Sequence, residues 1–204
     1  MLKIIITGPE SCGKTTLARQ LAAHFQTPLV VEYARHFFEK KQTPQYEEAD
    51  LLKIAEGQLA AEKQAEIALF EQLRSKNASD SPPLVICDTD LLTIKIWSEE
   101  KYKRCDEWII LHFTTSSSHL PTLYLLCSPE GIAWEADPLR ENATDRERLF
   151  NVYEKNLVFY QKNYVILRGG IDARFNEASR YINQVERLLR FQDNRIRERI
   201  SEKF

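Results

Sequence analysis

The sequence predicts a single α/β domain in which a five-stranded parallel sheet carries helices on both faces. Five short runs, nearly continuous in apolar residues and rich in Val, Ile and Leu, have the composition of strands buried on both faces. Helical patterns separate these runs along the whole chain, as right-handed crossovers between parallel strands require. The predicted strands are residues 2–7, 29–32, 84–88, 122–128 and 164–169.

The segments between the strands show the apolar spacing of helices. Leu17, Leu21 and Phe25, for example, recur every four residues after the first strand. With 204 residues the chain is long enough for one well-buried core and short for two. We therefore expect one domain over residues 1–190, followed by a charged helical tail, 191–204, that is either a solvated helix end or a contact surface for a partner. The predicted helices are residues 14–25, 46–76, 144–162 and 173–190, with a polar linker at 76–83.

Composition excludes several classes of function. A net charge of -2 and a pI near 6.1 argue against a broad nucleic-acid-binding face. No apolar run approaches the roughly 20 residues of a membrane span, and the N-terminus lacks a secretion signal, so we expect a cytoplasmic protein. Homo-oligomerisation stays open. The cysteines lack metal or redox spacing and are expected to be reduced thiols: Cys12, Cys87, Cys105 and Cys127.

The segment "GPESCGKT", residues 8–15, fits the pattern G-x-x-x-x-G-K-[ST] between a predicted strand and a predicted helix. In such a P-loop, backbone N–H groups and the helix N-terminus surround the phosphates of a nucleotide. Lys14 is expected to bridge the β- and γ-phosphates, and the Thr15 hydroxyl to coordinate Mg²⁺. The predicted cofactors are therefore ATP and Mg²⁺, and the predicted cofactor-binding residues are Gly8, Glu10, Ser11, Cys12, Gly13, Lys14, Thr15 and Thr16.

Three kinds of P-loop protein are considered: a small-molecule kinase, a molecular switch and a motor-type ATPase. The sequence has neither the N-K-x-D of guanine-binding switches nor an LSGGQ-like signature, and it is short for a motor domain. A small-molecule kinase needs an acid for Mg²⁺, an acceptor pocket and an arginine-bearing lid that excludes water. The sequence offers candidates for all three.

Acidic residues follow two of the predicted strands. Asp88 in "LVICDTD" is the expected Walker B carboxylate, and Asp90 is placed either to contact the acceptor or to cap the next helix, or both. Glu32 in "VVEYAR" is expected to take the proton of an acceptor hydroxyl or to hold a ribose. Tyr33 and Arg35 follow it, and Arg35 steadies an acceptor anion or forms a surface salt bridge with Glu32. Both segments end where the ligand crevice of a parallel sheet is expected.

A lid is predicted at about residues 129–150, after the fourth strand. Its arginine would bring positive charge to the γ-phosphate on closure. Arg140 is the best placed, whereas Arg146 and Arg148 could equally be solvated helix charges. Trp134, in a polar loop near Asp137, offers a flat surface to a ring.

The motifs that carry a resemblance to a known family are "GPESCGKTTLA", "EYAR", "DTD" with Trp97, and "CSPEGIAWEADPLREN". Through these motifs the sequence resembles the ribosylnicotinamide kinase domain of the bacterial NadR family, an AAA-like P-loop group. The resemblance covers residues 1 to about 190. It implies ATP-dependent phosphorylation of the 5′-hydroxyl of nicotinamide riboside, giving nicotinamide mononucleotide for NAD salvage. It also implies that Trp134 stacks on the nicotinamide ring and that Asp88 and Asp90 lie near Mg²⁺ and the riboside.

The sequence departs from this family in two respects. Pro138 stands where the family lid often has glycine, and proline stiffens the lid around Arg140. The family's adenylyltransferase and DNA-binding segments are not expected here, because the chain begins at the P-loop. We therefore expect the kinase domain alone.

The sequence thus predicts a kinase that phosphorylates a small molecule, with a riboside favoured as the acceptor. The predicted catalytic residues are Lys14, Glu32, Asp88 and Arg140, with Thr15 and Asp88 as metal ligands, and Glu32 and Asp88 are alternative proton acceptors. The alternatives are a kinase for another nucleoside or small alcohol, and an ATPase that acts as a nucleotide-gated regulatory or interaction protein. The predicted acceptor-binding residues are Glu32, Tyr33, Arg35, Asp90, Trp97, Trp134 and Asp137.

Overall fold

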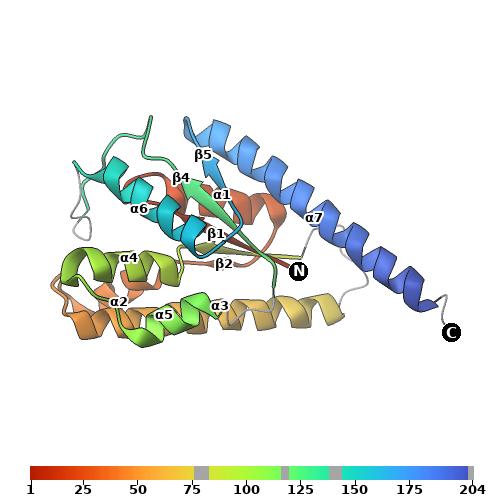
Figure 1. The fold of residues 1–204 in the computed structure, drawn as a ribbon, viewed down its shortest axis with the longest axis horizontal. Helices are drawn as coiled ribbons and strands as arrows, with labels where there is room; N and C mark the ends of the chain where they lie inside the picture. The colour runs from red at the N-terminus through yellow and green to blue at the C-terminus, as the bar shows by residue number, and fades with distance from the viewer. Residues whose placement is uncertain (76–82, 116–119, 138–143, 202–204) are drawn as a thin grey trace.

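The computed structural model describes residues 1–75, 83–115, 120–137 and 144–201, with side chains described as far as residue 191. Its centre is a five-stranded parallel sheet in the order β2-β3-β1-β4-β5 (Figure 1). The predicted fold class, a parallel sheet between helical layers, is confirmed. The strands are β1 (Leu2–Thr7), β2 (Leu29–Val30), β3 (Leu84–Asp88), β4 (Thr122–Cys127) and β5 (Tyr164–Leu167).

The sheet is covered on both faces because its central strands are apolar on both. In β1, Ile4 and Ile6 pack into one layer of the core, and Ile5 packs into the other. Ile4 lies in register with Ile86 of β3 and Leu123 of β4, so three strands contribute apolar side chains to the same layer. This continuous burial explains why the strands are nearly free of polar residues.

Two helices cover one face of the sheet, α1 (Lys14–Phe25) and α7 (Ile171–Ser201). The other face carries α2 (Tyr33–Lys41), α3 (Glu48–Ser75), α4 (Leu91–Tyr102), α5 (Glu107–Thr114) and α6 (Arg146–Phe159). Figure 1 shows α1 and α7 on the opposite side of the sheet from α2, α3, α4 and α5. Of these, α1, α3, α6 and α7 match predicted helices within a few residues at most ends. The start of α4 was anticipated only through the Asp90 cap, and α2 and α5 were not predicted.

The predicted second strand is longer than the observed one. β2 ends at Val30, and Glu32 already occupies the N-cap of α2. β2 is hydrogen-bonded to β3 alone, so it is an edge strand, and Val31 beyond it is 58% exposed. Without a second neighbour, the apolar run "LVVE" does not continue as a strand.

The strand order brings the predicted site residues to one edge of the sheet. β1 lies at the centre, and the chain runs first to β2 and β3 on one side and then to β4 and β5 on the other. Because all strands are parallel, the segments after β1, β2, β3 and β4 leave from the same edge, where α/β proteins bind their ligands. These segments are the P-loop, Glu32, Asp88 and the loop that follows Cys127.

The last helix continues through most of the predicted tail. α7 runs without interruption to Ser201, and its C-terminal turns extend past the rest of the ribbon in Figure 1. Nearly all of the predicted linker, residues 76–82, lies outside the described residues. Across the described ranges, every helix is too short or too polar to cross a membrane.

Candidate active site

The P-loop connects β1 directly to α1 and depends on two glycines. Gly8 has φ +134°, and a Cβ there would lie 2.7 Å from the carbonyl oxygen of Cys127. Gly13 has φ +80° and is the N-cap of α1, where no side chain accepts from the helix. The first N–H groups of α1 therefore face the loop, which is the arrangement that binds phosphate at a helix N-terminus.

Lys14 places a positive charge inside this loop. Its Nζ donates to the carbonyl oxygens of Gly8 and Pro9, at 3.0 and 2.7 Å. Burial alone would lower the pKa of Lys14, but the Cys12 sulfur and the carboxyl groups of Glu32 and Asp88 raise it overall. The ammonium is therefore charged, and it is aimed at the position where an anion would enter the loop.

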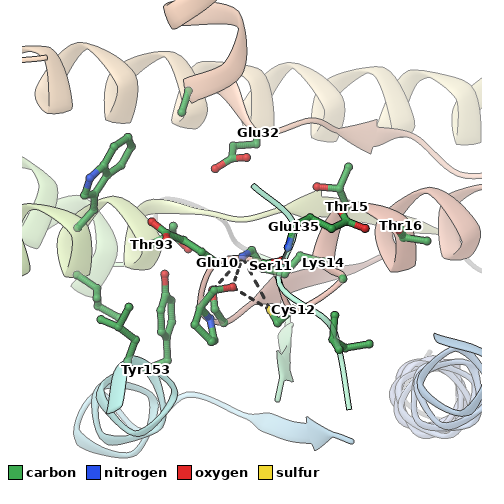
Figure 2. A pocket seen from close by; sticks show the side chains of 18 of the residues that line it. Glu10, Ser11, Cys12, Lys14, Thr15, Thr16, Glu32, Thr93, Glu135 and Tyr153 are labelled. Carbon is green, nitrogen blue, oxygen red and sulfur yellow. Dashed lines mark hydrogen bonds between the residues drawn. The ribbon is translucent and has the colours of Figure 1, made fainter. Parts of the chain in front are cut away.

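A cavity of about 270 Å³ opens beside the loop and contains most of the predicted site residues. Figure 2 shows the Glu32 carboxylate reaching into it from one side, with Lys14 and Thr15 on the P-loop and with Thr93 and Tyr153 at the opposite end from Thr15 and Thr16. Its lining includes every predicted cofactor-binding residue together with Glu32, Arg35, Thr93, Ile96, Trp97, Glu100, Glu135, Leu149 and Tyr153. The cavity thus has an anion-binding end and a largely apolar end.

Two carboxyl groups lie close to Lys14. Asp88 is 3% exposed; burial raises its pKa, while the Thr15 hydroxyl and the Lys14 charge oppose that rise. Burial likewise raises the pKa of Glu32, opposed by Lys14 and reinforced by Asp88. For both carboxyl groups, burial raises the pKa and the nearby Lys14 ammonium opposes the rise.

Asp88 and Thr15 fit a magnesium site. Asp88 Oδ1 is buried and accepts no hydrogen bond, so a buried oxygen lone pair is left for a cation. The Thr15 hydroxyl beside Asp88 adds a second hard oxygen, the ligand type that Mg²⁺ prefers. Among the residues that the structure describes, there is no cluster of three or more His, Cys, Asp or Glu side chains that could hold a metal ion.

Asp90 lies away from this cavity. Its Oδ1 accepts from Leu92 N–H at 3.1 Å, and its Oδ2 accepts from Tyr124 Oη at 2.7 Å. The predicted helix cap is therefore present, at the N-terminus of α4. Asp90 lines a second cavity, of about 210 Å³, that also contains Lys3 and Glu62. The predicted contact with the acceptor has no support in this geometry.

Exchanging Asp90 for asparagine should change how stability depends on pH. Burial, and next the carboxylate of Glu62, raise the pKa of Asp90 to about 7. Between the unfolded pKa near 4 and this value the native state binds the extra proton, so the wild type loses stability as pH rises, on the order of 4 kcal/mol in total. The asparagine side chain has no proton to lose and keeps the cap. We expect the stability of Asp90→Asn relative to wild type to increase from pH 5 to 7.5.

Urea unfolding across this pH range measures the difference. Asp106→Asn, the same exchange at the exposed N-cap of α5, is the matched control. A stability difference between Asp90→Asn and wild type that stays constant with pH would contradict the raised pKa.

The loop after β4 is attached to the P-loop and to α2. Ser11 Oγ donates to Ala133 O and accepts from Glu135 N–H, at 3.3 and 2.9 Å. Arg146 Nη1 donates to the carbonyl oxygens of Ser11 and Ile132, at 2.9 and 3.0 Å. The lid arginine that reaches the P-loop in the described residues is thus Arg146, at the start of α6.

The remaining lid residues are placed as follows. Asp137 accepts from Arg35 Nη1 at 3.0 Å, so these two predicted acceptor-binding residues bind each other, and Arg35 also lies 3.4 Å from Glu32. The Arg146 guanidinium lies 5.8 Å from the ring centre of Trp134, which is not among the described residues that line the cavity. Arg148 binds Glu100 through two nitrogens and joins α6 to α4. Arg140 and Pro138 lie outside the described residues.

The structure also brings forward residues that sequence reasoning missed. Tyr153 and Thr93 lie next to each other at the apolar end of the cavity, on α6 and α4. Arg174 on α7 is completely buried, and its guanidinium donates at 2.7–3.0 Å to the carbonyl oxygens of Gly169, Cys12, Ser128 and Glu130. A sequence signal for Arg174 exists, because it stands four residues before Ala178 on the buried stripe of α7 that also contains Ile182.

Comparisons with known proteins agree with this fold. Residues 3–174 match the family model described as AAA domain. No match was found among curated proteins. The fold is shared with a crystal structure of NadR protein in complex with NR, with a TM-score of 0.61 and 18% identity; the match covers 89% of this chain and 50% of that one. It is also shared with a crystal structure of NadR protein in complex with NAD and AMP-PNP, with a TM-score of 0.54 and 19% identity; this match covers 84% of this chain and 48% of that one. A third structure with this fold is thymidylate kinase from Ehrlichia chaffeensis, with a TM-score of 0.59 and 13% identity; the match covers 89% of this chain and 98% of that one. The chain therefore spans about half the length of the NadR structures.

Proposed function

The chain belongs to the AAA domain family, and from this membership and the site we propose that it is an ATP-dependent small-molecule kinase acting in the cytoplasm. The proposed acceptor is a riboside, with nicotinamide riboside favoured, and the proposed product is its 5′-monophosphate. The order of the P-loop, "EYAR" and "DTD" motifs supports this choice, as does the fold shared with the NadR protein bound to NR.

One observation carries the proposal: a single cavity joins the phosphate-binding loop to a separate apolar end. Lys14 and Thr15 line one part of it, and Ile96, Trp97 and Tyr153 line another. Glu32 lies at the same cavity. A hydrolytic switch needs room for the nucleotide and one water, whereas a kinase needs a second compartment for an acceptor. The apolar end provides that compartment.

The proposed reaction is in-line transfer of the γ-phosphoryl group. The acceptor hydroxyl oxygen forms a bond to the γ-phosphorus while the bond from phosphorus to the bridging β-phosphate oxygen breaks, releasing ADP. The hydroxyl proton passes to Glu32, whose raised pKa makes it a better proton acceptor than an ordinary carboxylate. Because the transition state is loose, this transfer occurs late and contributes modestly.

Charge stabilisation comes from the P-loop and its neighbours. Lys14 and the N–H groups of α1 hold the β- and γ-phosphate oxygens. Thr15 and Asp88 would hold Mg²⁺, which neutralises phosphate charge when bound. Arg146 is proposed for the part that was predicted for Arg140, because it already donates to the P-loop carbonyl of Ser11.

The acceptor ring is placed at the apolar end of the cavity. Trp97 is fixed there, since its Nε1 donates to the hydroxyl of Tyr46 and its ring lies against Tyr46 and Phe38. A fixed aromatic wall supplies area for stacking at little cost in side-chain entropy. We therefore assign ring stacking to Trp97 and Tyr153, and assign Trp134 to packing against Arg146.

A coupled ATP-consumption screen tests the proposal. Purified protein with Mg²⁺ and ATP is offered nicotinamide riboside, other ribosides, deoxyribosides and small alcohols, and products are identified by mass spectrometry. We expect ADP formation to be stimulated by a riboside and a matching 5′-monophosphate to appear. ATP hydrolysis that no acceptor stimulates would reject the kinase and favour the nucleotide-gated ATPase.

A further inference from the structure

A buried glutamine on α3 connects the two segments that carry the site carboxylates. Gln58 is 1% exposed and lies near the middle of α3, outside the cavity that holds the P-loop. Its Oε1 accepts from Tyr33 N–H at 2.9 Å. Its Nε2 donates to the carbonyl oxygen of Thr89 at 3.3 Å and to Glu62 Oε1 at 3.2 Å.

These three contacts select an amide. Tyr33 N–H can only donate, and the Thr89 carbonyl can only accept, so the side chain between them must accept on one side and donate on the other. An ionised carboxylate cannot donate, and an aliphatic side chain can do neither. Glu62 is in turn ion-paired with Lys3 of β1, which anchors the amide to the central strand.

Two of these contacts lie one residue from a carboxylate of the proposed reaction. Tyr33 is the first residue of α2, directly after Glu32. Thr89 follows Asp88 and has φ +72°, a conformation that non-glycine residues adopt rarely and hold only when their surroundings fix it. Gln58 thus holds the backbone beside both Glu32 and Asp88 from a single position.

The neighbouring glycine adds a second contact to this arrangement. A Cβ at Gly57 would lie 2.1 Å from a ring carbon of Tyr33, so the absence of a side chain lets the Tyr33 ring sit against α3. Glycine inside a helix costs about 1 kcal/mol relative to alanine. The helix thus carries this destabilising glycine at the position where α3 packs against Tyr33.

We propose that Gln58 is a positioning residue for phosphoryl transfer: through Tyr33 N–H and Thr89 O it sets the spacing between Glu32 and Asp88, with Gly57 seating the Tyr33 ring. The proposal rests on the proposed function, because Glu32 and Asp88 are assigned there. Gln58 itself contacts neither nucleotide nor acceptor. A misplacement of catalytic groups by about 1 Å can lower turnover roughly a hundredfold.

The test compares Gln58→Glu with Gln58→Leu and with the matched control Gln64→Glu, an exposed glutamine of the same helix. The charged group in direct contact with position 58 is Glu62, and Lys3, Glu66 and Asp90 surround Glu62. A glutamic acid there keeps its proton to higher pH beside Glu62 and can donate as the amide does, whereas its anion cannot. We expect Gln58→Glu turnover, relative to wild type, to fall about tenfold or more from pH 6 to 8.5.

Binding of Mg²⁺ and ATP, measured by calorimetry, should change by less than about threefold, since the P-loop itself is intact. Gln58→Leu should lose turnover at every pH, and Gln64→Glu should match wild type. A Gln58→Glu to wild-type ratio that does not vary with pH, or ATP affinity that falls together with turnover, would overturn the positioning role.

Gly57→Ala provides an independent variant. It should lower turnover at unchanged ATP affinity, because the added methyl displaces the Tyr33 ring and Glu32 with it; wild-type turnover in a folded Gly57→Ala would overturn the seating contact. If wild type phosphorylates no acceptor, the proposed function fails. Gln58 is then still tested through Mg²⁺-dependent ATP hydrolysis, where the same pH-dependent ratio is expected because Asp88 and Thr15 act there too.

Discussion

Exchanging Lys14 for alanine is expected to lower ATP-dependent turnover by about a thousandfold or more, the largest effect on activity that the site predicts. The ammonium is held inside the P-loop by the Gly8 and Pro9 carbonyls, where it faces the phosphate position. It supplies charge that the loop N–H groups cannot replace, and this charge matters most when negative charge builds up on the bridging oxygen.

The fold should survive this exchange. Lys14 is only half-buried, and the two carbonyl groups that it leaves belong to residues that line the cavity. We therefore expect the unfolding midpoint of Lys14→Ala to stay close to that of wild type while turnover is lost. Lys63→Ala, at an exposed lysine of α3, is the control for charge removal alone. Turnover in Lys14→Ala equal to wild type would refute the site.

Much of the fold could be predicted because its strands are buried on both faces. β1 and β3 match the predicted residues because every position in them is buried, which makes their ends sharp in the sequence. The sequence indicates the start of α4 through the Asp90 cap but not its course. This helix is buried on several sides, with Ile94, Lys95 and Ile96 all enclosed, so it shows no clear apolar stripe. Its buried Lys95 is neutralised by Glu99 and also donates to Asn156, contacts that a local pattern cannot reveal.

The phosphate-binding half of the site was predictable because its geometry is local. Eight consecutive residues, 8–15, form the loop, and the positive φ values of Gly8 and Gly13 both lie within it. The other half depends on side-chain direction after each strand. Asp90 was expected at the acceptor, at the helix cap or at both, and the positive φ of Thr89 turns the backbone between Asp88 and Asp90. Asp90 consequently meets Tyr124 instead of the cavity.

The direction of the lid arginines could not be predicted either. A sequence of mixed charge cannot tell which arginine reaches the P-loop, because that depends on where α6 starts. The helix begins at Arg146, and this places its guanidinium between Ser11 O and Ile132 O. Arg148, two residues on, points instead to Glu100 of α4.

Exchanging Arg174 for methionine is expected to have the largest effect on stability, a loss of about 3–5 kcal/mol. The guanidinium is completely buried and donates to four carbonyl oxygens, from the P-loop, from the loop after β4 and from the turn before α7. Methionine fills similar volume but leaves these carbonyl groups without donors. For a chain of this length the loss corresponds to a decrease of roughly 6–20 °C in the unfolding midpoint.

The same exchange should weaken nucleotide binding, because Arg174 fixes Cys12 O within the phosphate loop. Arg174→Lys keeps the charge but cannot reach four acceptors at once, so it should fall between wild type and methionine in both measurements. Arg180→Met, at an exposed arginine of the same helix, is the control. Differential scanning calorimetry with and without Mg²⁺ and ATP measures both effects. An Arg174→Met protein that unfolds within about 1 °C of wild type would show that the four carbonyl bonds contribute little, since even 1 kcal/mol shifts the midpoint by about 2–4 °C.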